Sequence, residues 1–217
     1  MLKKFSLFVV AMMLLGSTVS AHGSETGVTA DDALKMLIAG NQRYYSGLHE
    51  IVDIGQGRRN ELLKGQHPSA IIVSCSDSRV PPELIFDNGL GALFVIRTAG
   101  EVVDDEALGS VEYAIEHLGV KLVVVLGHED CGAVKATIAG EKVPSHISAI
   151  AKAIAPAVDK AKTQQGDLVA NAVNNNVDMI VSKLKASEPI IKEGIARDHV
   201  KVVGAVYHLE TGKVVFR

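Results

Sequence analysis

The sequence has 217 residues, of which 47% are hydrophobic, so the chain is long and apolar enough for one domain with a substantial core. Its formal net charge is −3, it contains no Trp, and only 4% of its residues are aromatic. No run of Lys and Arg is longer than a pair. These features disfavour a nucleic-acid surface or an aromatic platform that stacks bases or sugars, and we expect a small substrate.

Residues 1–21 have the pattern of a secretory signal peptide: a basic start, the apolar run "FSLFVVAMMLLG" and the small residues "VSA" at a cleavage site. The apolar run is shorter than the roughly 20 residues that span a membrane, so we expect cleavage rather than an anchor. Loss of Lys3 and Lys4 changes the net charge from −3 to −5. We predict a periplasmic protein, free of the membrane, whose single domain comprises residues 22–217.

The next segment is predicted to form an N-terminal helical arm over residues 29–65. Thr29 is a candidate N-cap with Asp32 three residues later. Apolar residues then follow at helical spacing: Leu34, Leu37 and Ile38. A second short helix is predicted over "GRRNELLKG".

From "SAIIVSC" onward, short apolar runs rich in Val and Ile alternate with helical patterns. The other runs are "ALFVIR", "KLVVVLG" and "VKVVGAVYHL", and such runs are typical of strands buried on both faces of a parallel sheet. "DDEALGSVEYAIEHLG" and residues 145–195 have helical patterns, with "TQQGD" and "NNN" interpreted as bends between helices. "ETGK" predicts a hairpin that ends in an antiparallel edge strand. The predicted fold is α/β, with a mostly parallel central sheet and helices on both faces.

The two cysteines of the chain both follow predicted strands. Cys75 closes "AIIVS", while His128 and Cys131 come directly after "KLVVVLG". Carboxyl ends of parallel strands share one edge of the sheet, and i, i+3 spacing lets His128 and Cys131 face one point if a helical turn begins there. Two thiolates and one imidazole, with a fourth position left open, are a ligand set typical of catalytic zinc.

Two other interpretations of the cysteines remain open on the residues alone. A disulfide between Cys75 and Cys131 would suit an oxidising compartment, and two unreactive core thiols would need no partner. A structural disulfide, however, requires neither His128 nor the pair Asp77 and Arg79 beside Cys75. That pair, taken by itself, would be interpreted as a surface salt bridge.

"CSDSR" and "HEDC", whose cysteines are 56 positions apart, resemble the β-class carbonic anhydrases, as do the surrounding "LFVIRTAG" and "SVEYAIEHLGVKLVVVLGHEDCGAV". The resemblance implies Zn²⁺ held by Cys75, His128 and Cys131, and reversible hydration of carbon dioxide to bicarbonate and a proton. It also implies a catalytic dyad in which Arg79 holds Asp77 off the metal, so that Asp77 can orient the nucleophile.

The same resemblance implies a substrate pocket formed by Gln66, Phe94, Ala99, Tyr113 and Gly132. Gln66 would donate a hydrogen bond to substrate oxygen, and the Gly132 N–H would bind a bicarbonate oxygen. Without the resemblance, Gln66 would be interpreted as a polar loop residue, and Phe94 and Tyr113 as ordinary core.

Family members place the active site at a dimer interface, with the helical arm over the partner. The resemblance therefore implies a homodimer or a dimer of dimers in which Gln66, Phe94 and Tyr113 serve the neighbour's zinc. Alternatives are hydrolysis of carbonyl sulfide or carbon disulfide with the same ligands, and a non-catalytic module that binds zinc or bicarbonate. A nucleotide-binding domain would need a glycine-rich loop after the first strand, and "CSDSRVPP" is not one.

Overall fold

The structure is a computed structural model that describes residues 27–50, 54–140 and 144–217. The predicted signal peptide, residues 1–21, lies outside the described residues. Within the described ranges, no helix combines the length and the apolar character needed to cross a membrane.

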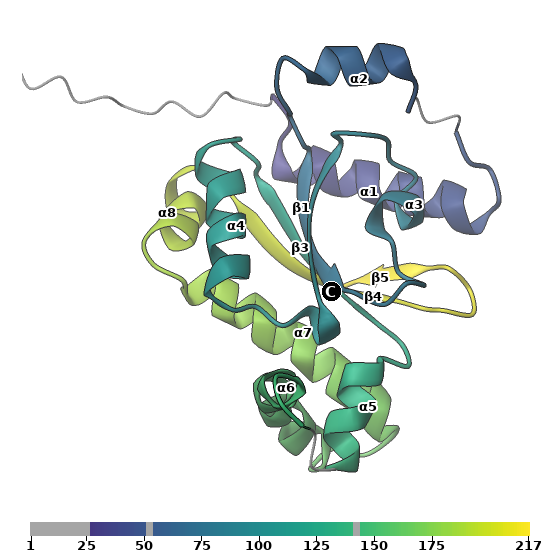
Figure 1. Cartoon of the computed structure of the whole chain (residues 1–217), viewed down its shortest axis with the longest axis vertical. Helices are drawn as coiled ribbons and strands as arrows, with labels where there is room; N and C mark the ends of the chain where they lie inside the picture. The colour runs from purple at the N-terminus through teal and green to yellow at the C-terminus, as the bar shows by residue number, and fades with distance from the viewer. Residues whose placement is uncertain (1–26, 51–53, 141–143) are drawn as a thin grey trace, which may run out of the picture.

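A five-stranded sheet of order β2-β1-β3-β4-β5 forms the centre of the fold (Figure 1). Its first four strands pair in parallel, and β5 runs antiparallel to β4 at the edge, as predicted. All residues of β1 and β3 are buried, which explains why their sequences are continuously apolar. The strands are β1 (Ala70–Cys75), β2 (Leu93–Thr98), β3 (Leu122–His128), β4 (Lys201–Tyr207) and β5 (Val214–Phe216).

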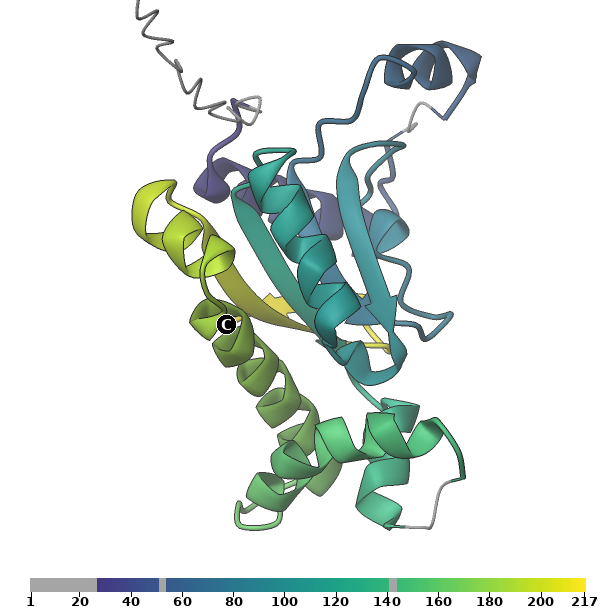
Figure 2. The ribbon, with the colours of Figure 1, turned by 60° about the vertical axis from the view of Figure 1, so that its left-hand side comes forward.

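Helices cover both faces of the sheet, which confirms the predicted α/β class (Figures 1 and 2). Alternate residues of β1 face opposite ways: Ile71 and Val73 pack toward α4–α8, and Ile72 toward α1 and α3. The helical elements are α1 (Ala30–Tyr45), α2 (Gln56–Leu62), α3 (Pro82–Ile85), the 3₁₀ turn η1 (Ala99–Glu101), α4 (Asp105–Glu116), α5 (Gly132–Ala139), α6 (Ile147–Ala161), α7 (Leu168–Ala186) and α8 (Ile190–Arg197).

The two helices of the N-terminal arm differ in how they pack. Helix α1 begins with the predicted cap, in which the Thr29 hydroxyl accepts the Asp32 N–H at 3.1 Å, and buries Ala33 and Leu37 against its own sheet. Helix α2 has no buried residue within the described structure. Figures 1 and 2 both show α2 standing away from the sheet. Helix α1 therefore packs on the sheet, whereas α2 contacts its own chain at the loop before β2, where Arg58 Nε donates to Leu90 O at 3.1 Å.

The "NNN" segment, residues 174–176, is not a bend between helices but lies inside α7. The Asn175 carboxamide donates to Ala157 O at 3.3 Å and to Gln164 Oε1 at 2.8 Å. The Asn176 carboxamide likewise finds partners in η1. Tertiary hydrogen bonds from the two Nδ2 groups thus offset part of the cost of burying these amides, and the local preference of Asn for bends is overridden. "TQQGD" does form the turn between α6 and α7.

Candidate metal centre

The side chains of Cys75, His128 and Cys131 converge at the carboxyl edge of the sheet. Cys75 is the last residue of β1 and His128 the last of β3, and these strands are parallel neighbours. The two sulfur atoms and a ring nitrogen all lie within 4.8 Å of one another. All three residues are buried, and His128 is fully so. Side chains far apart in sequence therefore form one compact cluster of soft and borderline ligands.

The turn that brings Cys131 to the cluster differs from the predicted one. No helical turn begins at His128. Asp130 instead has a left-handed conformation, with φ 54°, and α5 starts only after Cys131, which occupies its N-cap position. Asp tolerates this conformation better than most residues because its short side chain bonds locally, and here Asp130 also pairs with Lys135 at 2.7 Å. A single left-handed residue reverses the chain and aims both side chains at one point.

One ring nitrogen of His128 is hydrogen-bonded and the other has no hydrogen-bond partner among the described residues. Its Nδ1 lies 2.7 Å from the backbone oxygen of Glu129, and since a carbonyl only accepts, Nδ1 carries the proton and donates. Nε2 is then left with a lone pair that is buried and has no hydrogen-bond partner in the described part of the chain. Such an atom is costly to bury unpaired, and a metal ion at the cluster would satisfy it.

Both cysteines are free thiols, not a disulfide. A hydrogen bond from Cys131 lowers the pKa of Cys75 to about 4, and the same bond together with burial raises the pKa of Cys131. The N–H of Gly100 also donates to Cys75 Sγ at 3.3 Å. Burial lowers the pKa of His128, but the Cys75 thiolate and the Glu129 carbonyl raise it by more. One thiolate therefore forms readily, and a divalent ion would displace the remaining proton from the second sulfur.

Asp77 and Arg79 form a bidentate pair beside the cluster. Asp77 Oδ1 accepts from Arg79 Nε at 2.9 Å, and Oδ2 accepts from Nη2 at 2.7 Å. Asp77 Oδ2 also lies 3.8 Å from His128 Nε2. The hydrogen bonds from Arg79 hold the pKa of Asp77 well below its ordinary value, so it remains a carboxylate at neutral pH. A fixed negative acceptor thus lies within reach of the cluster.

Arg97, which the sequence analysis did not select, holds the loop between Cys75 and Asp77. Its Nε donates to Cys75 O at 2.9 Å, and its Nη2 donates to Asp77 O at 2.6 Å. Arg97 lies in β2, where "LFVIRT" is otherwise almost entirely apolar. A charged residue inside such a strand was the signal that could have identified it, because burial of a charge requires partners.

The predicted pocket residues fall into two groups. Ala99 directly follows β2, and Gly132 directly follows Cys131, so both lie near the cluster. Phe94, in contrast, pairs with Ile71 near the start of β1, whereas Cys75 pairs with Thr98. Phe94 and Thr98 are four positions apart on β2, which corresponds to roughly 13 Å along the strand.

Tyr113 and Gln66 accompany Phe94 and not the metal ligands. The rings of Tyr113 and Phe94 are 6.2 Å apart, and the exposed Gln66 precedes the start of β1. Within one chain, therefore, these three side chains lie at the opposite end of the strands from Cys75.

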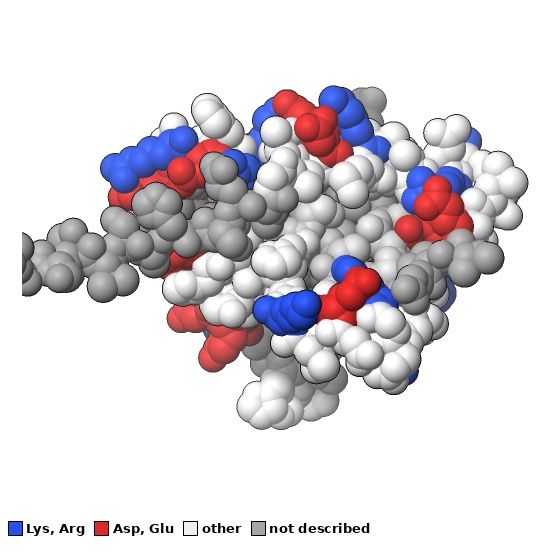
Figure 3. Space-filling model, turned by 90° about the horizontal axis from the view of Figure 1, so that it is seen from above, with Lys and Arg blue, Asp and Glu red and all other residues white. Residues whose placement is uncertain are grey.

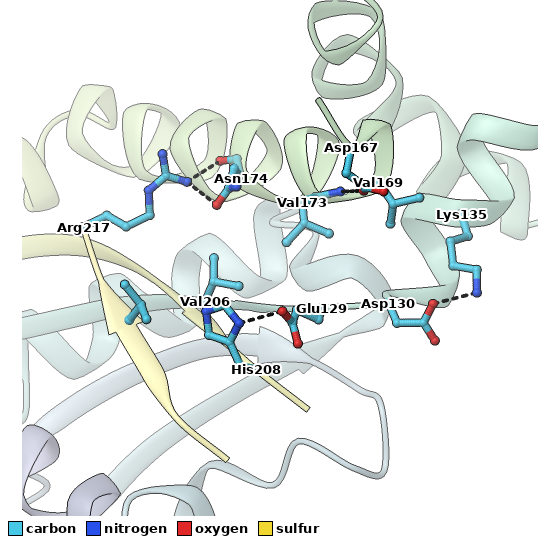
Figure 4. Close-up of a pocket in the computed structure, with 12 residues that line it drawn as sticks. Glu129, Asp130, Lys135, Asp167, Val169, Val173, Asn174, Val206, His208 and Arg217 are labelled. Atoms are coloured by element: carbon cyan, nitrogen blue, oxygen red, sulfur yellow. Dashed lines mark hydrogen bonds and ion pairs between the residues drawn. The ribbon is translucent and has the colours of Figure 1, made fainter. Parts of the chain in front are cut away.

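A hollow of about 780 Å³ lies beside the turn that carries Glu129 and Asp130 (Figure 4). The charged side chains in its wall are paired: His208 with Glu129 at 2.6 Å, and Lys135 with Asp130 at 2.7 Å. Arg217 pairs with Asn174 and Asp178, and Asp167 caps α7. No unpaired charge among the described residues of this wall is left to select a ligand. Glu129 lies in the wall of the hollow, and its backbone oxygen accepts the hydrogen bond from His128 Nδ1.

Comparison with known proteins identifies the family. A family model described as "Carbonic anhydrase" matches residues 70–214. The chain is 39% identical over 189 residues to a carbonic anhydrase of Mycolicibacterium smegmatis, covering 85% of this chain and 92% of that protein. Carbonic anhydrase 2 of Mycobacterium tuberculosis is also 39% identical, with 85% and 91% covered. The chain belongs to the β-carbonic anhydrase family.

Solved structures of β-carbonic anhydrases share the fold. A Coccomyxa β-carbonic anhydrase in complex with acetazolamide superposes with a TM-score of 0.66 at 28% identity, covering 84% of this chain and 80% of that one. A tetrameric β-carbonic anhydrase of Sordaria macrospora gives a TM-score of 0.68 at 25% identity, with 73% and 84% covered. The resemblance drawn from "CSDSR" and "HEDC" is confirmed at the level of family and fold.

Proposed function

We propose that this β-carbonic anhydrase catalyses the zinc-dependent, reversible hydration of carbon dioxide to bicarbonate and a proton. The observation that carries the proposal is the buried cluster of Cys75, His128 and Cys131, in which Nε2 of His128 is unpaired, with the Asp77–Arg79 pair beside it. Membership of the family supports the same activity.

The donor set fits Zn²⁺, which would be held by Cys75, His128 and Cys131. Bound there, zinc would supply a Lewis acid with one position open to water, whose pKa it lowers toward neutrality. Asp77, kept anionic by Arg79, would accept a hydrogen bond from the nucleophile and orient its lone pair toward carbon dioxide. Because both carboxylate oxygens already bond to Arg79, the pair favours a site in which Asp77 is not itself a metal ligand.

The substrate pocket, on this proposal, is completed by a second copy of the chain. Ala99 and the Gly132 N–H belong to the same subunit as the metal ligands, whereas Gln66, Phe94 and Tyr113 would serve the partner's site. The distance along β2 between Phe94 and the strand end supports this division.

The surface around the arm supports a dimer. Tyr113 is 46% exposed, and Leu63 and Leu84 are 84% and 64% exposed. Figure 3 views this end of the molecule, where acidic and basic side chains lie in small mixed groups with uncharged surface between them. Apolar side chains at this level of exposure are typical of an interface, and α2, which Leu63 caps, has no buried residue within the described structure. The related Sordaria proteins are described as tetrameric, and a dimer of dimers would be the corresponding assembly.

Metal analysis combined with stopped-flow hydration of carbon dioxide tests the proposal. The purified protein is expected to contain about one zinc per chain and to accelerate hydration far above buffer. Cys75→Ser should lose zinc and activity together. Zinc retained without acceleration would favour a binding module, and faster turnover of carbonyl sulfide or carbon disulfide than of carbon dioxide would favour the hydrolase.

We also propose that the protein is exported to the periplasm. The support is confined to residues 1–21, with their basic start, apolar run and small residues. Cell fractionation and the mass of the mature protein test it: a mature chain that begins near His22 is expected, and full-length protein in the cytoplasm would contradict it.

A further inference from the structure

The turn that follows β2 supplies a hydrogen bond to one of the metal ligands. The N–H of Gly100 donates to Cys75 Sγ at 3.3 Å. Gly100 and the next residue, Glu101, both have left-handed backbone conformations, with φ 67° and 45°. A side chain at Gly100 would also meet Ile154, since an added Cβ would lie 2.6 Å from its Cδ1. The turn has little room, and Glu101 is in a conformation that a non-glycine residue adopts only when its surroundings enforce it.

The Asn176 side chain is the group that holds this turn from outside. Asn176 lies on α7 and is 1% exposed. Its Nδ2 donates to Gly100 O at 2.9 Å and to Glu101 Oε1 at 2.9 Å. Both of its N–H groups are therefore used on the two left-handed residues. Its Oδ1 has no partner in the described ranges, so the side chain acts on the turn as a donor alone.

We propose that Asn176 is a positioning residue for the metal centre: by holding Gly100 and Glu101, it keeps the Gly100 N–H on the Cys75 sulfur. This inference rests on the zinc site proposed above. An N–H···S hydrogen bond withdraws electron density from a thiolate, so its loss leaves a more strongly donating and less well oriented sulfur. The hydrogen bonds of Asn176 in the described part of the chain go to Gly100 and Glu101 and not to the metal ligands, so it would act through η1.

Cobalt substitution gives a readout of the two thiolate ligands, because thiolates bound to Co²⁺ give a charge-transfer absorption whose energy depends on the electron density of the sulfur. The hydrogen bonds from Asn176 through η1 lead to Cys75, so a shift in this absorption is expected to come from that sulfur. In Asn176→Ala, this band should move to longer wavelength. The affinity for zinc, measured by competition with a chelator, should fall about 10-fold, the lower end of the range for loss of an outer hydrogen bond.

Asn175→Ala is the matched control. Asn175 is the adjacent residue on α7 and is also buried, and its carboxamide donates to Ala157 and Gln164 rather than to η1. Its loss should lower the melting temperature as much as the loss of Asn176, yet leave the cobalt band in place. Asn176→Leu retains a side chain of similar size, adds no charge next to Glu101 and removes the donors, so it should reproduce the spectral shift if Asn176→Ala does not fold.

Two results would overturn the inference: a wild-type cobalt band in the Asn176 variants, or an equal shift in Asn175→Ala. Failure of the wild-type protein to bind zinc or cobalt would instead overturn the proposed metal site. The two failures are distinguishable because the second appears before any substitution is made.

Discussion

Glu101 is a fully buried carboxyl group close to the metal centre. It is 1% exposed, and Asn176 is the donor to its Oε1. Burial raises the pKa of Glu101 from its ordinary value of 4.5 to about 7, with a further contribution from the charge of Cys75. A carboxyl in this position binds a proton more tightly in the folded protein than in the unfolded chain, and folding stability must therefore depend on pH.

In the metal-free protein, the contribution of Glu101 to stability is expected to fall as pH rises from 4.5 to about 7, because the unfolded chain releases the Glu101 proton before the folded one does. Above that range, the lost contribution to the free energy of unfolding should level off at about 3 kcal/mol, because each pH unit between the two pKa values corresponds to about 1.4 kcal/mol. The lowered pKa of Cys75 acts in the opposite direction, so the Glu101 effect is the difference between the wild type and a variant without this carboxyl. Glu101→Gln keeps an acceptor for Asn176 and removes the titration. Urea denaturation of both proteins at pH 5 and pH 8 checks this, and an identical pH dependence in the variant would contradict it.

Asp77→Asn should retain zinc and slow hydration about 10- to 100-fold, as other substitutions next to metal sites do. An amide presents only one acceptor oxygen and cannot form the ionic pair with Arg79. Asp159→Asn is the control, because Asp159 is an exposed carboxylate on α6 paired with Lys162. Stopped-flow hydration rates and the zinc content of both variants test this prediction. An unchanged rate in Asp77→Asn would remove Asp77 from the mechanism.

At the scale of elements, the position of α7 depends on two glycines in the strands beneath it. An added Cβ on Gly127 of β3 would lie 2.6 Å from Val177 Cγ2, and one on Gly204 of β4 would lie 2.7 Å from Val177 Cγ1. Helix α7 can approach both strands only because these positions have no side chain. That approach also brings Asn176 to η1.

Gly204→Ala should destabilise the fold by about 1–3 kcal/mol, the usual cost of overpacking. Val177→Ala removes the colliding methyl groups, so the double variant should recover part of the loss, and the two substitutions should not be additive. Gly57→Ala is the control, since nothing lies within 4 Å of its added Cβ. Denaturant midpoints of the wild type, the two single variants, the double variant and the control test this; strictly additive losses would contradict the close contact.

At the scale of the whole molecule, the proposed exchange of pocket residues between subunits can be tested by complementation. Cys75→Ser leaves a subunit without a working metal site, and Gln66→Ala leaves one that cannot serve its partner. In a mixed dimer, the site of the Gln66→Ala subunit would receive an intact Gln66 from the other chain.

Mixing the two variants after dissociation and reassembly should therefore restore roughly a quarter of wild-type activity, because half of randomly reassorted twofold dimers are mixed and each has one complete site. Activity that stays at the average of the two separate variants would place Gln66 in its own subunit. Size-exclusion chromatography of the same samples checks that mixed dimers form.

The strands, the terminal hairpin and the family could be predicted because their signals are local. A strand buried on both faces needs continuous apolar residues, and "ETGK" reverses the chain by itself. The types of the metal ligands and their proximity could also be predicted, because Cys75 and His128 lie at the carboxyl ends of predicted parallel strands. The arm was predicted as one unit, yet α1 packs on its own sheet and α2 does not, which depends on the surfaces available in three dimensions.

The parallel sheet, the thiol and imidazole groups at its carboxyl edge and the family can all be predicted from the sequence, because hydrophobic periodicity and residue type are local properties of the chain. Other features depend on tertiary contacts: Asn176 is buried in a helix, Arg97 and the Gly100 N–H bond to the Cys75 segment, and Phe94 lies a strand length from the ligands. Those contacts join residues with no local signal for one another, and strand register and helix packing alone bring them together.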